Sequence, residues 1–185
     1  MRRTIAAVIT VTLSCLATVA AQPPTAPKPG PEHQKLAYFV GTWTSTGEMK
    51  ASPFGPGGKI TMTESCEWFQ GGFAVVCRSE GTSPMGPTKG LGIMGYNAEG
   101  KVYTYYGVDA SPMNMASVPK GTVQGDTWTY NDEAMMGGKK IRSRFVLKIA
   151  SPTSYSFRWE MEQAPDKWMA VMEGTATKKG TGTAN

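Results

Sequence analysis

The feature that most constrains this chain is a regular alternation of side chains within short runs that are separated by turn signals. Between residues 42 and 177, Gly, Pro, Asn and Asp interrupt these runs about every 8–12 residues. In the run 154–162, apolar side chains alternate with Ser156, Arg158 and Glu160. This pattern is typical of antiparallel strands with one buried face and one solvent-exposed face. We therefore predict an all-β fold of about ten strands in an antiparallel up-and-down barrel, because closure removes exposed edges.

The expected strands follow one another with short connections. They span residues 42–49, 59–69, 73–80, 89–96, 101–108, 116–124, 127–134, 139–149, 154–162 and 168–177. A short helix is expected before them at residues 32–39, since this segment follows a proline and carries Leu36, Phe39 and Val40 on one side. We expect this helix to pack against the barrel as a lid or plug.

Two cysteines lie on the arms of a predicted hairpin at residues 65–78. If Gly71 and Gly72 form a two-residue turn, Cys66 lies opposite Cys77, and the spacing favours a cross-strand disulfide. In such a hairpin this would be a hydrogen-bonded pair, whose α-carbons lie farther apart. Strain or a different turn would then spoil the bridge. No metal site is expected here, because the nearby sequence offers no third or fourth soft ligand.

The first 21 residues have the organisation of a cleavable signal peptide. Arg2 and Arg3 are followed by a short apolar core at 5–13 and by small residues at 19–21. We predict a signal peptide at 1–21, a Pro-rich linker at 22–31, a barrel domain at 32–179 and a disordered tail at 180–185. The location would be periplasmic or secreted. Two alternatives stay open: a retained membrane anchor, and a lipoprotein modified at Cys15.

The charge of the chain is mild. Its 19 basic and 14 acidic residues give a net charge of +5, and removal of Arg2 and Arg3 leaves 17 − 14 = +3. No run of Lys or Arg indicates a nucleic-acid surface. We expect neither nucleic-acid binding nor membrane insertion after signal cleavage. The sequence does not indicate whether the protein forms oligomers.

Six segments occur in a fixed order along the chain: CEWFQGGFAVVCRSEG, SPMGPTKGLGIMGY, KVYTYYGVD, GDTWTY, SPTSYSFRWEM and WMAVMEGTATKK. Together they resemble a bacterial family catalogued as domain-of-unknown-function family 1579, over about residues 32–179. The resemblance implies a calycin-like barrel related to lipocalins and fatty-acid-binding proteins. It implies no activity and no catalytic residues. Residues 41–43, Gly-Thr-Trp, also resemble the Gly-x-Trp that opens lipocalin barrels, so we expect Trp43 to be a core plug.

Inward aromatic side chains of such a barrel would line a pocket for a small lipophilic ligand. The candidate lining residues are Trp68, Tyr103, Tyr105, Phe145, Phe157, Trp159 and Met161. The predicted function is therefore an exported barrel that binds a small lipophilic molecule. One alternative is a module that binds other envelope proteins, and a less favoured one is an enzyme that uses a buried carboxylate.

The chemistry-bearing residues give little support to catalysis. The only histidine, His33, lies next to the Pro-rich linker, so we expect a surface role rather than a catalytic or haem-binding one. Glu64 is the carboxylate of interest for the enzyme alternative, although surface charge is the favoured interpretation for it and for Glu160 and Glu162. We predict no catalytic residue, no metal and no cofactor.

Two further groups of residues have alternative interpretations. Methionines beside the loops suit a Cu(I) site or, as we prefer, the rim of a lipophilic pocket. They are Met85, Met113, Met115, Met135 and Met136. The arginines that alternate with apolar residues either hold a carboxylate inside the barrel or, as we prefer, lie on its surface. They are Arg78, Arg142, Arg144 and Arg158.

Overall fold

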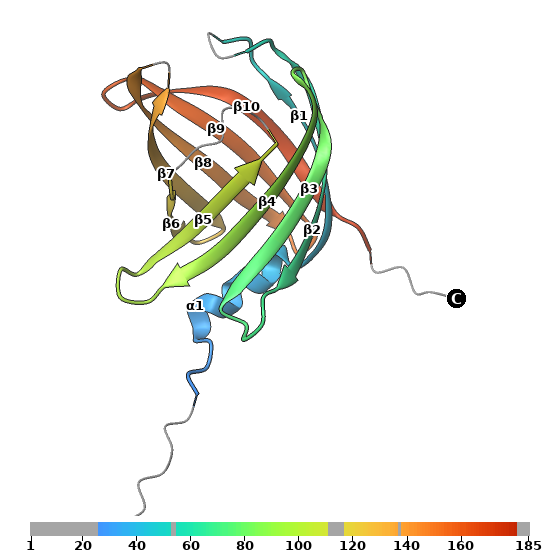
Figure 1. Ribbon diagram of the computed structural model, residues 1–185, viewed down its shortest axis with the longest axis vertical. Coiled ribbons are helices and arrows are strands. Elements are labelled where there is room, and N and C mark those ends of the chain that lie inside the picture. The colour runs from blue at the N-terminus through green and yellow to red at the C-terminus, as the bar shows by residue number, and fades with distance from the viewer. Residues whose placement is uncertain (1–25, 53–54, 111–116, 137, 181–185) are drawn as a thin grey trace, which may run out of the picture.

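The chain folds into a closed antiparallel barrel of ten strands with one short helical segment at its N-terminal end (Figure 1). The structure is a computed structural model that describes residues 26–52, 55–110, 117–136 and 138–180. Each strand pairs with its neighbours in sequence, and β1 pairs with β10 to close the wall. The predicted fold class is confirmed.

The strands have lengths of five to thirteen residues. They are β1 Gly41–Met49, β2 Gly58–Trp68, β3 Ala74–Ser83, β4 Gly86–Asn97, β5 Val102–Asp109, β6 Lys120–Gln124, β7 Thr127–Met136, β8 Lys139–Ser151, β9 Ser154–Ala164 and β10 Lys167–Lys178. The helical segment comprises α1, Pro31–Gln34, and a 3-10 turn η1, Lys35–Phe39.

Three strand boundaries differ from the predicted ones by three residues or more, and the others agree within two residues. The connection between the strands predicted at 73–80 and 89–96 is a tight turn, because β3 extends to Ser83 and β4 begins at Gly86, which adopts a positive φ of 110°. The sixth strand begins at Lys120 instead of residue 116. Pro119 lacks a backbone N–H and cannot donate to a strand ladder, and its carbonyl instead accepts a hydrogen bond from Tyr105 at 3.3 Å.

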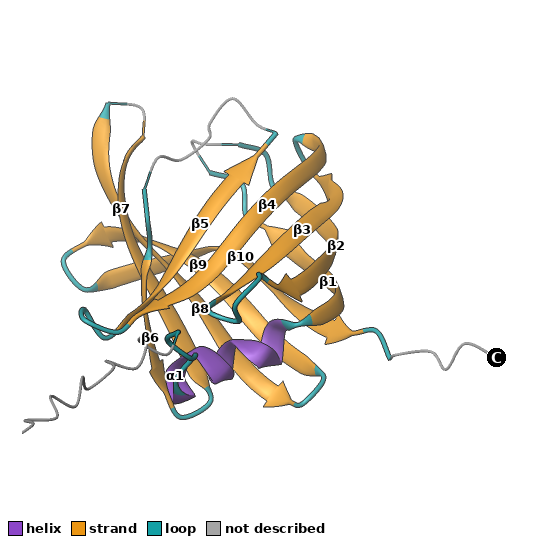
Figure 2. Ribbon diagram, turned by 60° about the horizontal axis from the view of Figure 1, so that its bottom comes forward, coloured by secondary structure: helices purple, strands orange, loops and turns teal. Residues whose placement is uncertain are grey.

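The helical segment closes one end of the barrel, as predicted (Figure 2). Leu36 and Phe39 are buried in the core, and Trp43, which begins the wall above them, is 1% exposed. The indole Nε1 of Trp43 donates to the carbonyl of Phe39 at 2.8 Å. On the opposite side of this plugged end, the Tyr103 hydroxyl donates to the Glu32 carboxylate at 2.6 Å. The plug is therefore tied to β1 and to β5.

The predicted disulfide between Cys66 and Cys77 is present, but the hairpin turn differs from a two-residue one. The backbone N–H of Phe69 donates to Ala74, which makes this pair the last hydrogen-bonded one before a four-residue loop. Counting back along the ladder, the cysteines form a non-hydrogen-bonded pair, the class in which strands approach most closely. Their α-carbons lie 4.0 Å apart. The different turn thus favours the bridge instead of spoiling it.

The arginines of the β-strands lie on the outer face, as preferred from the sequence. Each pairs with a glutamate across the sheet surface: Arg78 with Glu67, Arg142 with Glu162, and both Arg144 and Arg158 with Glu160. The guanidinium of Arg144 also stacks over the ring of Trp168, at 4.3 Å from its centroid. The aromatic side chains of the same strands point the other way, into the barrel, and Phe145 stacks on Phe157.

The ten seams of the wall are unequal in length. Neighbouring strands share five or more residue pairs at nine seams, but β5 and β6 share only two in the described chain, Tyr103 with Gly121 and Thr104 with Lys120. The upper part of β5 therefore lacks a ladder partner on that side within the described residues. A hydrogen bond from Tyr105 to Pro119 extends this contact by one residue.

Several predictions concern residues that the structure does not describe. The predicted signal peptide at 1–21, part of the linker at 22–31, and residues 181–185 of the predicted tail lie outside the described residues. Met113 and Met115 also lie outside them. In the described part of the chain, no helix has the length and apolar character needed to cross a bilayer.

Candidate ligand-binding cavity

The barrel encloses a cavity of about 510 Å³ above the helical plug. Its floor includes Phe39 of η1, and its wall consists of inward-facing side chains from most of the strands. The apolar side chains that point into it are Phe39, Ile60, Met62, Met94, Phe145, Leu147, Phe157, Trp159 and Met172. Tyr105, Tyr130 and Tyr155 add aromatic rings with a hydroxyl group. The cavity is thus mainly apolar with a few polar atoms, which is the usual character of a small-molecule site.

Four of the seven predicted lining residues border this cavity: Tyr105, Phe145, Phe157 and Trp159. They come from three strands, β5, β8 and β9, and the structure brings them together across the barrel. Period-two alternation was sufficient to select them, because it identifies the inward face of a strand.

The other three predicted residues are placed elsewhere. Trp68 packs against the core at the end of β2, next to the hairpin loop, and does not border the cavity. Tyr103 lies beside the plug, where its hydroxyl bonds to Glu32. Met161 is buried in β9 and is likewise outside the lining. Trp68 and Tyr103 thus pack at a different height along the barrel from the cavity.

The sequence interpretation missed Tyr130 and Tyr155 as cavity residues. Tyr130 follows Trp128 on the inward face of β7 and pairs across the strands with Phe145. Tyr155 precedes Phe157 and Trp159 on one face of β9. In both cases the same alternation that selected their neighbours would have found them.

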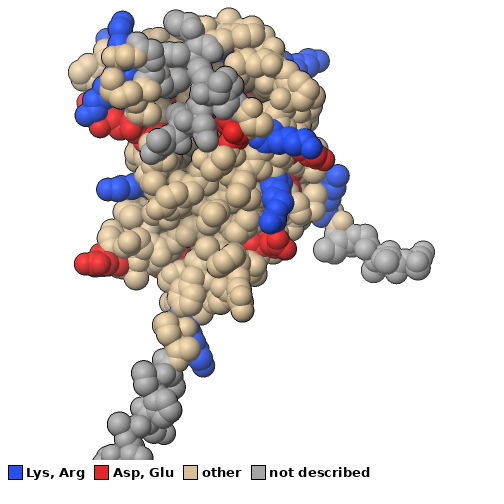
Figure 3. Space-filling model, in the orientation of Figure 1, with Lys and Arg blue, Asp and Glu red and all other residues tan. Residues whose placement is uncertain are grey.

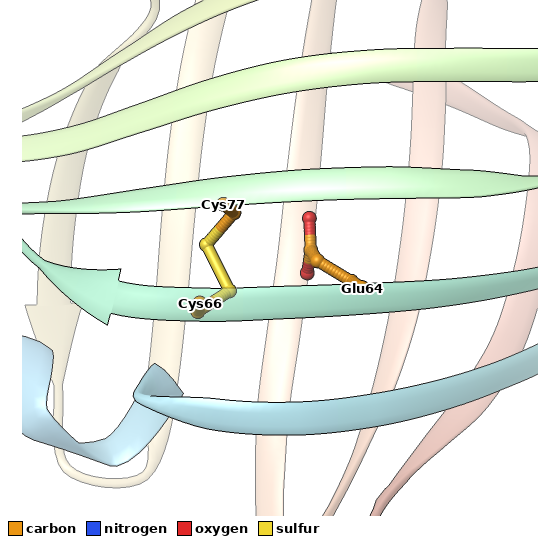
Figure 4. A group of neighbouring side chains, drawn as sticks. All are labelled: Glu64, Cys66 and Cys77. Carbon is orange, nitrogen blue, oxygen red and sulfur yellow. A yellow bond between two sulfur atoms is a disulfide. The ribbon is translucent and has the colours of Figure 1, made fainter.

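Glu64 lies inside the barrel, so its interpretation as an ordinary surface charge was wrong. It stands two residues from Cys66 on the inward face of β2, and both the disulfide and the carboxylate lie between β2 and β3 (Figure 4). Burial in this apolar cavity raises the pKa of the Glu64 carboxyl, because the charged form loses hydration there. No hydrogen bond or ion pair to Glu64 is present among the described residues.

The outer-face carboxylates have a different environment. Glu160 is also buried, but on the outside of β9, where Arg144 and Arg158 supply its counter-charges. Glu162 is paired with Arg142 in the same way. Glu64 is half-buried inside the barrel and has no positive partner among the described residues.

The three cavity tyrosines remain neutral at ordinary pH. Burial, and then the nearby charge of Glu64, raises the pKa of Tyr105 to about 12. Burial likewise raises the pKa of Tyr130 and of Tyr155. The hydroxyl of Tyr130 is buried without a hydrogen-bond partner among the described residues. The cavity therefore presents neutral hydroxyl groups next to the Glu64 carboxylate.

The donor set around Glu64 does not fit a metal. A carboxylate oxygen of Glu64 and the sulfur atoms of Cys66 and Cys77 lie within 4.8 Å of one another. The two sulfurs are joined in a disulfide, however, and metal binding by cysteine requires thiolates. One carboxylate remains, which is too few ligands for a structural or catalytic zinc site.

Of the five methionines predicted at a barrel rim, the structure describes the side chains of Met85 and Met135. Met85 and Met135 are exposed at the end of the barrel opposite the plug. Neither borders the cavity. The side chain of Met136 is outside the described set.

A second hollow, of about 920 Å³, lies on the outer surface across β8, β9, β10, β1 and β2. It is wide open, and charged side chains of both signs border it, among them Lys59, Arg158 and Glu173. A small apolar molecule would stay largely hydrated there. The enclosed cavity is smaller but better suited to remove a ligand from water.

Replacing Glu64 with glutamine is expected to stabilise the protein near pH 7 and to change how its stability depends on pH. Because the folded-state pKa of Glu64 lies above the unfolded one, the folded wild type binds the extra proton and loses stability as pH rises between the two values. The variant lacks this loss. Urea unfolding from pH 4 to 8 should show the two proteins converging at the acidic end. A wild-type advantage at pH 7 would contradict the burial of an unpaired carboxyl.

Comparisons with known proteins agree with this architecture. The chain shares its fold with the crystal structure of Rv2717c from M. tuberculosis, with a TM-score of 0.56 and 10% identity, covering 82% of this chain and 99% of that one. It also shares it with the S-type phycobiliprotein lyase CPES from Guillardia theta, with a TM-score of 0.54 and 12% identity, covering 80% and 92%. At these identities the likeness concerns the fold alone.

The sequence itself places the chain in a family. No curated protein matches it. Residues 28–178 match the family model described as "Protein of unknown function (DUF1579)", which covers most of the chain and agrees with the resemblance noted from its segments. The chain therefore belongs to the DUF1579 family.

Proposed function

We propose that this protein binds a small, mainly apolar molecule inside its barrel. The observation that carries the proposal is the cavity of about 510 Å³ inside the barrel, which has an apolar and aromatic lining and lies above the helical plug. This volume falls in the range of about 300–1,000 Å³ that is common for ligand sites. Each methylene group that a ligand buries there contributes about 0.8 kcal/mol.

Export to an oxidising compartment is part of the same proposal. The leader pattern of residues 1–21 supports it, and the Cys66–Cys77 disulfide is compatible with it, since such bonds persist mainly outside the cytosol. The ligand would then be a molecule of the cell envelope or of the medium.

The two alternative functions have weaker support. A protein-interaction module would show an exposed apolar patch and no cavity, and the cavity argues against it. The outer face of β4 and β5 does carry two exposed apolar pairs, Leu91 with Val108 and Ile93 with Tyr106. Charged side chains are sparse in the middle of the face drawn in Figure 3. This patch keeps the alternative compatible with the structure.

An enzyme would need groups arranged around a reacting bond. Glu64 has the raised pKa of a general acid, but the described cavity residues show no nucleophile hydrogen-bonded to a base. A carboxyl group that stands alone among aromatic rings is better suited to hold a ligand than to transform it.

Filling the cavity is expected to abolish ligand binding. Replacing Met62 with tryptophan adds a large ring to the cavity wall, whereas replacing Met85 with tryptophan adds the same ring at an exposed turn. Titration with Nile red, a neutral dye whose fluorescence rises in apolar surroundings, should show binding by the wild type and by Met85→Trp, and at least a tenfold weaker signal for Met62→Trp. Equal binding by both variants would place the dye outside the barrel.

Native mass spectrometry of protein purified from its own host tests both export and ligand binding. A chain that begins at Gln22 and carries a co-purified small molecule is the expected result. A full-length chain, or a bare chain after gentle purification, would count against export or against binding, respectively.

A further inference from the structure

The charged groups that border the cavity are all acidic. They are Glu64, Asp109 and Asp132, and no Lys, Arg or His borders the cavity in the described chain. This contrasts with the whole protein, in which 19 basic residues outnumber 14 acidic ones. The strand arginines lie on the outer face, where glutamates neutralise them. The charged side chains that border the cavity are thus all negative, although the protein as a whole is basic.

Two polar groups inside the cavity lack a partner within the described chain. The hydroxyl of Tyr130, a residue that is 5% exposed and lines the cavity, makes no hydrogen bond. The half-buried Glu64 carboxylate has no hydrogen bond and no positive counter-charge among the described residues. Buried polar groups in folded proteins are nearly always satisfied, so each exception needs an explanation. A ligand that carries hydrogen-bond donors and a positive charge would satisfy both.

The surrounding rings suit a cation as well. Tyr105 and Tyr155 lie close enough to Glu64 for its charge to affect their pKa values. The faces of aromatic rings attract ammonium groups, and this attraction grows when the site is desolvated. An ammonium group near Glu64 would therefore gain from both the carboxylate and the rings.

We propose that the ligand is a lipophilic amine, with an ammonium group that pairs with Glu64 and an apolar body that packs against Phe145, Phe157 and Trp159. This inference rests on the proposed function, and it narrows the ligand class. Lipophilic carboxylates are disfavoured, because they would bring a further negative charge next to Glu64, and the described lining of the cavity contains no base. The site is thus opposite in charge preference to a barrel that holds fatty acids with an inward arginine.

The affinity for an amine should depend on pH. The groups that face Glu64 from neighbouring strands are Trp43 on β1, Ser79 on β3, Tyr105 on β5 and Tyr155 on β9. The tyrosines stay neutral below pH 9, which leaves Glu64 as the facing group whose charge changes with pH. As pH falls through the raised pKa of Glu64, protonation removes the charge that the ammonium needs.

Three matched probes test the inference: 1-naphthylmethylamine, 1-naphthalenemethanol and 1-naphthoate, which share one ring system and differ in charge. Isothermal titration at pH 8 should show the amine binding at least tenfold more tightly than the alcohol, and the carboxylate most weakly. At pH 4.5 the preference for the amine over the alcohol should shrink, while the affinity of the alcohol stays the same.

Glu64→Gln and Glu67→Gln provide the matched variants. Both change one glutamate of β2 to its amide, but Glu67 is exposed on the outer face and pairs with Arg78. Glu64→Gln should remove the preference for the amine over the alcohol, whereas Glu67→Gln should keep the preference of the wild type. If Glu64→Gln does not fold, the comparison of the three probes on the wild type still decides the question.

The outcomes separate the two proposals. Equal binding of amine and alcohol, or tighter binding of the carboxylate, overturns the amine inference and leaves the binding function in place. An amine preference that survives Glu64→Gln also overturns it. Failure of all three probes and of Nile red to bind would reject the binding function itself, and the amine inference with it.

Discussion

Replacing Trp43 with alanine is expected to lower the free energy of unfolding by about 3–5 kcal/mol, the usual cost of removing a large buried aromatic ring. Trp43 is fully buried, and its ring contacts those of Tyr38 and Tyr155 at centroid distances of 5.3 and 5.0 Å. It also joins the plug to the wall through the hydrogen bond to Phe39. The loss would therefore combine a cavity with an unsatisfied carbonyl group.

Urea unfolding followed by tyrosine fluorescence measures this change, and Trp43→Phe is the control. Phenylalanine keeps much of the ring volume but removes the indole N–H, so it should cost about 1–2 kcal/mol. The alanine variant should also bind Nile red more weakly if it folds, since the floor of the cavity would be open. Similar stabilities for wild type and Trp43→Ala would show that Trp43 is not a plug.

Removing the disulfide is expected to cost about 3 kcal/mol, because the bond closes a short loop and restricts the unfolded chain. Cys66 and Cys77 are separated by 11 residues, and both side chains are buried in the core. The double variant Cys66→Ala/Cys77→Ala replaces both sulfurs by small apolar groups, so no unpaired thiol remains to complicate the comparison.

The measurement is urea unfolding of the double variant and of wild type, each with and without dithiothreitol. Reductant should lower the midpoint of the wild type toward that of the variant and leave the variant unchanged. A wild type that ignores reductant even after complete unfolding would contradict the bond. The expected difference is large enough, at about 3 kcal/mol, to stand clear of extrapolation error.

The fold was largely predictable because its main determinant is local. Alternation along Tyr155, Phe157 and Trp159 shows which face is buried, and turn residues show where strands end. The start of the sixth strand was predicted wrongly, because Pro119 precedes the ladder although the general pattern continues through it. The predicted two-residue turn between Phe69 and Ala74 was also wrong. Loops of two and of four residues give the same cysteine register, and only the backbone hydrogen bonds distinguish them.

The candidate site was less predictable, because alternation gives the face of a residue and not its height along the barrel. Tyr103 and Tyr105 share the inward face of β5, yet one binds the plug and the other borders the cavity. Height depends on register and on how deep the plug sits, which are tertiary properties. Glu64 was misjudged for another reason: carboxylates are rarely buried unpaired, and that general preference outweighed the alternation with Met62 and Cys66.

The short ladder between β5 and β6 has a consequence for how the barrel moves. Parting the wall there breaks far fewer backbone hydrogen bonds than at any other described seam, and Tyr105, next to it, borders the cavity. Thermal opening should concentrate at this line, so backbone amides of β5 and β6 should exchange with deuterium before those of β8 and β9. A ligand too wide for the open end of the barrel would enter most easily between β5 and β6.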